Sequence, residues 1–76
     1  MYILISTDGY NITTSNFNSQ FEAVNEMTEK FNRLLQEETG CKSLNEFNDE
    51  KSFNNLYSDA ALYTGENVYV WKIIEV

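Results

Sequence analysis

The stretch that decides the fold is Val68-Tyr69-Val70-Trp71-Lys72-Ile73-Ile74-Glu75-Val76. It is rich in β-branched and aromatic residues, which favour a strand. Because successive side chains of a strand point to opposite faces, Tyr69, Trp71 and Ile73 share one face. The opposite face carries the aliphatic residues Val68, Val70, Ile74 and Val76. A strand that is apolar on both faces is typical of the centre of a sheet, with a covering layer on each side.

The start of the chain has the same two-sided character. Residues 1–7 form a short, largely apolar run in which Ile3 and Ile5 oppose Tyr2 and Leu4. Both faces of this second strand therefore carry large apolar side chains. We predict that the two terminal segments are the central strands of one sheet.

A hairpin is expected directly after the first strand. Asp8-Gly9 favours a type I′ turn, because both centres of that turn need positive φ. Residues 10–14 then alternate between larger and smaller side chains and predict a weaker strand at a sheet edge. Residues 15–18 are polar apart from Phe17 and are interpreted as a loop.

Residues 19–40 have the pattern of one long amphipathic helix. Ser19-Gln20-Phe21-Glu22 has the form of a capping box, and Gly40 is a natural C-terminal stop. Apolar residues recur at helical spacings and predict one buried stripe: Phe21, Val24, Met27, Phe31, Leu34 and Leu35. The helix is therefore expected to pack on one face of the sheet.

Charged residues of this helix are expected on its outer side. Glu26 with Lys30, and Glu29 with Arg33, have the i,i+4 spacing and order that favour ion pairs. Glu37-Glu38 falls in the last turn, where the partial negative charge of the helix dipole opposes a carboxylate. We expect a mild local conflict there.

The rest of the chain completes a ββαββ order. Ser43-Leu44-Asn45-Glu46 repeats the capping-box pattern and predicts a short helix that ends near Asn48. Residues 49–55 are interpreted as a polar connection, residues 56–63 as a third strand, and residues 68–76 as the fourth. We predict an α+β fold with a four-stranded sheet and one main helix on one face. The same element order occurs in the β-grasp superfold, in which the terminal regions supply the central strands.

One long helix covers one face of a sheet, whereas both terminal strands are apolar on two faces. Either the short helix and the connection over residues 47–53 wrap the second face, or that face stays partly open. An open apolar face predicts an interface, formed with a second copy or with a partner protein. The residues predicted to form it are Tyr2, Leu4, Val68, Val70, Ile74 and Val76.

The composition indicates one acidic globular domain over residues 1–76. A hydrophobic fraction of 42% is too high for a disordered chain, and the length suffices for one domain only. Twelve acidic residues against five basic ones give a net charge of −7, which disfavours direct binding to nucleic acid or an anionic membrane. No basic region precedes the first short apolar run, so we expect no secretory signal, no membrane span and a cytoplasmic location.

The residues that most often carry enzyme chemistry are missing or poorly placed. The chain has no histidine, the commonest general base and metal ligand. Its single cysteine, Cys41, can form neither an intramolecular disulfide nor a Cys-rich zinc site, and a cysteine nucleophile needs a neighbouring base. The adjacent carboxylates Glu37-Glu38 and Asp49-Glu50 lie in polar segments. We therefore predict no enzyme activity, no cofactor and no metal.

Two functional hypotheses follow. The first is a non-enzymatic protein-interaction module that self-associates as a homodimer, through the open face or an edge strand, or binds another protein. Tyrosine and tryptophan, which are enriched at protein interfaces, favour it. The second is a small acidic inhibitor, encoded by a phage or mobile element, that binds a basic surface on a host nucleic-acid or defence enzyme. Its acids are too sparse to copy duplex DNA, which carries about one charge per 1.7 Å.

Three segments also carry a resemblance to known proteins: Met1–Thr7, Ser19–Leu35 and Val70–Val76. In that order they resemble small uncharacterised proteins of gut Firmicutes and their mobile elements. Those proteins begin with a short strand, continue through a Ser/Thr-capped amphipathic helix and end in a Trp-Lys-Ile-type strand. The resemblance supports the predicted element order, and it implies no activity and no functional residues.

Overall fold

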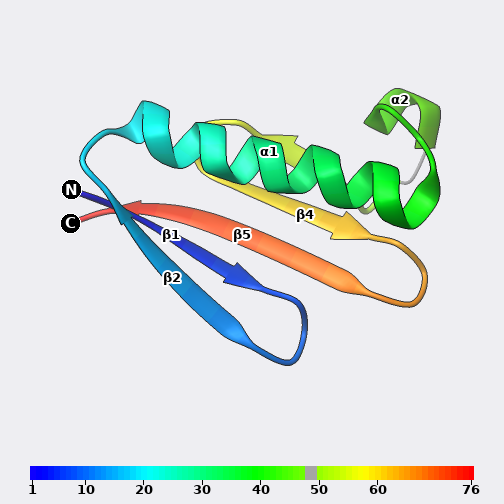
Figure 1. The fold of residues 1–76 in the computed structure, drawn as a ribbon, viewed down its shortest axis with the longest axis horizontal. Coiled ribbons are helices and arrows are strands. Elements are labelled where there is room, and N and C mark those ends of the chain that lie inside the picture. Colours follow the sequence, from blue (N-terminus) through cyan, green and yellow to red (C-terminus); the bar gives the residue numbers. More distant parts are fainter. Residues whose placement is uncertain (48–49) are drawn as a thin grey trace.

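A computed structural model describes residues 1–47 and 50–76. The predicted helix end at Asn48 and the carboxylate of Asp49 lie outside these ranges. The helices are α1 (Gln20–Thr39) and α2 (Leu44–Phe47). The strands are β1 (Tyr2–Thr7), β2 (Ile12–Phe17), β3 (Phe53–Asn55), β4 (Asp59–Tyr63) and β5 (Val68–Glu75). Figure 1 shows α1 running along one face of the single sheet.

The strands form one antiparallel sheet in the order β2-β1-β5-β4-β3. β5 is the middle strand and β1 lies beside it, which confirms that the terminal segments are central. The first and last residues consequently lie together, and the backbone N–H of Val76 donates to the carbonyl of Met1 at 2.9 Å. The α+β class with one helix packed on a sheet is confirmed.

The prediction of four strands is wrong, because part of the polar connection forms a fifth. Residues 53–55 pair with β4, with Phe53 opposite Ala61. A strand of three residues is too short to show an alternating pattern in the sequence. The β-grasp arrangement is also wrong, since its terminal strands run parallel whereas β1 and β5 are antiparallel.

Two strand boundaries differ from the prediction for local reasons. β2 extends through residues 15–17, predicted as a loop, because all six of its residues pair with β1. β4 begins at Asp59 instead of residue 56, because Ser58 closes a turn by donating its N–H to the carbonyl of Asn55 at 2.8 Å. Pairing with β1 thus sets the end of β2, whereas a turn sets the start of β4.

Helix α1 begins and ends as predicted. The hydroxyl of Ser19 accepts from the backbone N–H of Glu22 at 3.2 Å. Gly40 has a φ of 75°, and its N–H donates to the carbonyl of Gln36 at 2.9 Å. This left-handed conformation favours glycine, so Gly40 stops the helix at low cost.

The buried stripe of α1 differs from the predicted one at its first turn. The residues of α1 that face the sheet are Ala23, Met27, Phe31 and Leu35. Phe21, predicted to begin the stripe, is 73% exposed. A helix turns by about 100° per residue, so Phe21 points about 200° away from Ala23. The prediction for Phe21 is therefore wrong.

The core lies between α1 and the sheet. The strands contribute Leu4, Ala60, Leu62, Trp71 and Ile73 to it. The rings of Phe31 and Trp71 meet edge to face, with centroids 5.8 Å apart. α2 packs against this same core through Leu44 and Phe47, so neither described helix covers the opposite face of the sheet (Figure 1). Of the two alternatives for that second face, the described residues support the one in which the face stays partly open.

Candidate functional site

The sheet face opposite α1 is called the open face. Residues directly opposite one another in neighbouring strands share a face, so the register assigns each side chain. Ile5 lies opposite Lys72, which lies opposite Asp59. One row away, Ile3 lies opposite Ile74. All these side chains point away from α1, because Trp71 and Ile73 between them belong to the core.

The open face carries apolar or aromatic side chains from all five strands. They are Ile12 of β2, Ile3 and Ile5 of β1, Val68, Val70 and Ile74 of β5, Ala61 and Tyr63 of β4, and Phe53 of β3. Ile12 is 74% exposed and Phe53 is 39% exposed. Ala61 is buried, and the other central members are partly covered by their neighbours within the sheet. Apolar side chains gathered on an uncovered sheet face are typical of an interface.

Some of the predicted interface residues lie on this face. Val68, Val70 and Ile74 alternate along β5 on the side away from the core. Val76 follows the end of β5 and is exposed. The alternation read from the sequence of β5 was therefore sufficient to place these side chains.

The prediction that Leu4 and Tyr2 belong to the interface is wrong. Leu4 is 1% exposed and lies opposite Ile73 in the core. Tyr2 packs against the core, and its hydroxyl donates to Oε2 of Glu75 at 2.7 Å. Ile3 and Ile5 occupy the open face instead. Both faces of β1 are equally apolar in sequence, so only the register with β5 decides which one faces α1.

Lys72 and Asp59 are the charged residues of the open face among the described strand positions. The Asp59 carboxylate accepts from the hydroxyl of Ser58 at 2.7 Å and from the amide of Asn55 at 3.2 Å. These hydrogen bonds, and then the positive charge of Lys72, lower the pKa of Asp59. The centre of an apolar surface therefore holds one anion, in its ionised form, beside one cation.

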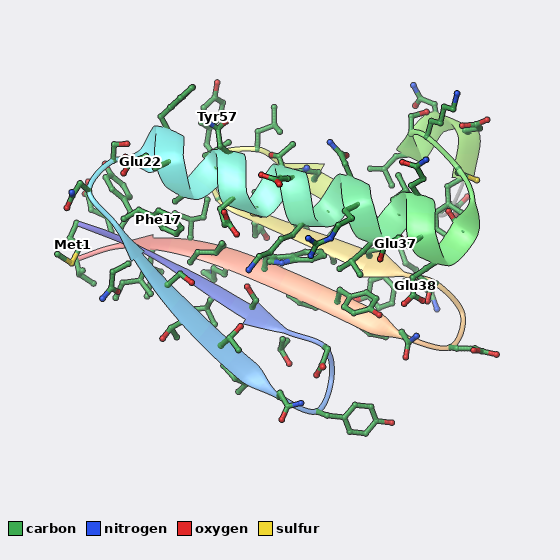
Figure 2. The ribbon with its side chains drawn as sticks, viewed as in Figure 1. Met1, Phe17, Glu22, Glu37, Glu38 and Tyr57 are labelled. Atoms are coloured by element: carbon green, nitrogen blue, oxygen red, sulfur yellow. The ribbon has the colours of Figure 1, made fainter. Side chains whose placement is uncertain are left out.

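Glu38 lies at the end of α1, near the turn between β4 and β5 (Figure 2). Three side chains of the β4–β5 hairpin hold it. It accepts from the hydroxyl of Tyr69 at 2.5 Å, the amide of Asn67 at 3.1 Å and the hydroxyl of Thr64 at 3.2 Å. These bonds lower the pKa of Glu38, and the bond to Glu38 raises the pKa of Tyr69 to about 12. They offset the predicted conflict with the helix dipole and give Glu38 a structural role.

The described residues hold no group of three or more Asp, Glu or Cys side chains arranged to bind a metal. Cys41 is half-buried, and its Sγ approaches the carbonyl of Thr39 at 3.8 Å. Within residues 1–47 and 50–76, neither helix is both long and apolar enough to cross a membrane.

The fold and the site together define a two-layer α+β domain whose antiparallel sheet has one face under helices and one apolar face open. In comparisons with known proteins, no family model, no curated protein and no solved structure matches the chain.

Proposed function

We propose that the chain is a non-enzymatic interaction module that forms a homodimer by packing two open faces together. The observation that carries the proposal is the apolar surface contributed by all five strands and left uncovered by α1 and α2. Removing apolar surface from water stabilises an assembly by about 25 cal/mol per Å². Two sheets packed face to face lie about 10 Å apart, as in a β-sandwich.

The charges at the centre of the open face favour a second copy of this chain as the occupant. A twofold interface brings the same patch of both subunits together, so the patch must be complementary to itself. Lys72 and Asp59 are neighbours on adjacent strands. A twofold axis that runs along the strands between β5 and β4 places Lys72 against the partner's Asp59, and the converse.

The same axis also matches the apolar side chains by size. Val70 and Ala61 lie opposite one another in the sheet, as do Val68 and Tyr63. Rotation about the axis sets Val70 over the partner's Ala61, so a larger side chain meets a small one. Interdigitation of this kind is what packed sheets need.

The net charge of the chain opposes dimerisation, and the resulting salt dependence identifies the dimer. Two copies of charge −7 repel each other at low ionic strength. Salt screens this repulsion over a Debye length of about 10 Å at 0.1 M and leaves the apolar contact intact. Dimerisation should therefore tighten as salt is raised, whereas binding to a basic protein should weaken.

The acidic-inhibitor hypothesis has less support from the described residues. Glu22 and Glu29 lie on α1, whereas Asp8 and Glu66 lie in two different turns. Acids spread in this way form no continuous row that copies the phosphates of a nucleic acid. We place the proposed dimer in the cytoplasm, as the sequence predicts.

Sedimentation equilibrium over a range of protein concentrations tests the proposal. We expect a species of twice the 8.8 kDa chain mass, and we expect Val70→Lys to dissociate it by placing a cation in the apolar contact. Phe21→Lys is the matched control, because it adds the same charge at an exposed position on α1. A wild-type chain that stays monomeric at high concentration, or dimers equally weakened by both substitutions, would contradict the proposal.

A further inference from the structure

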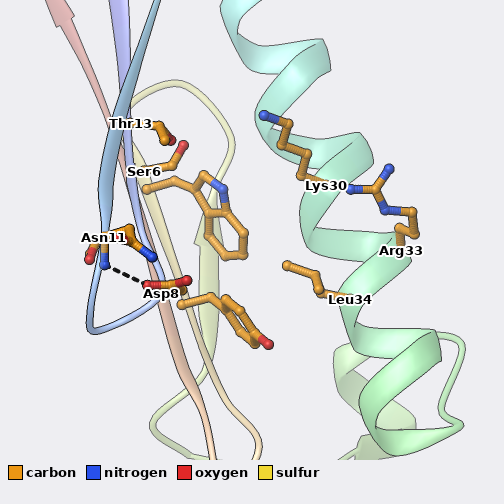
Figure 3. A pocket seen from close by; sticks show the side chains of 10 residues that line it. Ser6, Asp8, Asn11, Thr13, Lys30, Arg33 and Leu34 are labelled. Atoms are coloured by element: carbon orange, nitrogen blue, oxygen red, sulfur yellow. Dashed lines mark hydrogen bonds between the residues drawn. The ribbon is translucent and has the colours of Figure 1, made fainter.

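A second surface lies on the helix side of the sheet and is independent of the open face. A cleft of about 200 Å³ separates α1 from the far end of the β1–β2 hairpin (Figure 3). It exists because the hairpin changes character along its length. Leu4 and Phe17 pack against the core near one end, whereas Ser6 and Thr13, opposite one another at the other end, are small and polar. They leave space beneath α1.

Two of the five basic residues of the chain line this cleft from α1. Lys30 forms the predicted ion pair with Glu26 at 3.4 Å. Arg33 does not form its predicted pair with Glu29, and it makes no ion pair with any residue in the described ranges. Arg33 instead lies at the wall of the cleft (Figure 3), so its guanidinium is available to a ligand.

Aromatic rings form the base of the cleft. Tyr69 and Trp71 line it from β5, and their rings are stacked at 23° with centroids 6.2 Å apart. Phe31 of α1 meets Trp71 edge to face, and Glu38 holds the hydroxyl of Tyr69. The rings are thus fixed in place. Trp71 is only 3% exposed, so Tyr69 supplies most of the aromatic surface of the cleft.

The hairpin wall supplies polar groups. The hydroxyls of Ser6 and Thr13 make no hydrogen bond with a described group, and Figure 3 places both residues level with Lys30. Asp8 lies closer to the hairpin turn, and its Oδ1 accepts from the backbone N–H groups of Tyr10 at 2.9 Å and Asn11 at 2.8 Å. Positive charge and free hydroxyls therefore gather at one end of the cleft, and the carboxylate of Asp8 is engaged at the other.

We propose that the cleft binds a small organic anion with one flat ring, an aromatic carboxylate. The carboxylate pairs with the guanidinium of Arg33 and accepts from the hydroxyls of Ser6 and Thr13, while the ring lies against Tyr69 and close to Trp71. Arginine matches a carboxylate through two parallel hydrogen bonds. Sites for drug-sized ligands measure about 300 to 1,000 Å³, so a smaller cleft suits a ligand of one ring.

Trp71 is the only tryptophan and lines the cleft, so its fluorescence reports on binding. We expect benzoate to change the emission saturably, and benzamide and acetate to bind about tenfold more weakly or worse, because each lacks one of the two recognised groups. Arg33→Gln should weaken benzoate binding by a similar factor. Lys42→Gln is the matched control: it removes the same charge at an exposed position outside the cleft lining and should leave binding unchanged.

Several outcomes would overturn the proposal: no saturable change with benzoate, benzamide binding as tightly as benzoate, or equal losses in Arg33→Gln and Lys42→Gln. Thermal unfolding of Arg33→Gln, expected at the wild-type temperature, shows that the variant is folded. The Val70→Lys variant separates this proposal from the dimer, because a monomer with an intact cleft should still bind benzoate.

Discussion

The two faces of the sheet are built from the same five strands and carry similar apolar side chains, but only one of them is covered. The covered face packs Leu4, Trp71 and Ile73 against the buried stripe of α1. The open face presents Ile3, Val70 and Ile74 to solvent. The difference shows that apolar content alone does not identify a core. The number and placement of the covering helices decide which face becomes the core and which remains available for contact.

The largest predicted effect is the difference in stability between two phenylalanine substitutions, one on each face of the sheet. Phe31 is buried between α1 and Trp71, so Phe31→Ala should lower the free energy of unfolding by about 3–5 kcal/mol. Phe53 lies on the open face and is 39% exposed, so Phe53→Ala should lower it by about 1 kcal/mol or less in a monomer. Urea unfolding at low protein concentration measures both. Equal losses would mean that the open face is covered in the monomer.

The next prediction concerns the charges at the centre of the open face. In the proposed dimer, Lys72→Asp sets a carboxylate against the partner's Asp59, so the dissociation constant should rise about tenfold or more. The double variant Asp59→Lys with Lys72→Asp exchanges the charges and should restore it. Sedimentation equilibrium gives both constants. If the double variant stays as weak as the single one, Lys72 and Asp59 do not face each other across a twofold axis.

A third prediction concerns the pH range over which the end of α1 stays attached to the β4–β5 hairpin. The folded-state pKa of Glu38 is lowered, so its contribution to stability is present above the unfolded value of about 4.3 and is lost as pH falls through the folded value. The pKa of Tyr69 is raised to about 12, so its contribution is present below about 10 and is lost as pH rises towards 12.

Thermal unfolding as a function of pH checks this expectation. Glu38→Gln should flatten part of the acid limb, while the lowered pKa values of Asp8 and Asp59 maintain the rest of it. Tyr69→Phe should flatten the alkaline limb and leave the open face unchanged. An alkaline limb that is unchanged in Tyr69→Phe would show that the hydrogen bond between Tyr69 and Glu38 contributes nothing to stability.

Local signals in the sequence predicted where the helices and strands lie better than they predicted which elements pack against each other. The caps at Ser19 and Gly40, and the alternation along β5, each depend on neighbouring residues only, and they are correct. Which face of β1 would be buried depends on its register with β5, so nothing local assigned Leu4 to the core. The cleft was missed for the same reason: Arg33 and Ser6 are far apart in sequence and meet only through the packing of α1 on the sheet. The spacing of Glu29 and Arg33 could not reveal that these two residues do not form an ion pair, because i,i+4 spacing favours such a pair without enforcing it.

The smallest predicted effect tests the rotation of α1 about its own axis. Phe21 belongs to the apolar spacing of the helix in sequence, yet it is 73% exposed. Phe21→Ala should therefore change the free energy of unfolding by less than about 0.5 kcal/mol, the range of ordinary surface substitutions. Met27→Ala, in the buried stripe of the same helix, should cost about 2–5 kcal/mol. Chemical denaturation of both variants measures the contrast. A loss of several kcal/mol at Phe21 would mean that the first turn of α1 is rotated towards the sheet, and that the covered face extends farther along the helix than Ala23.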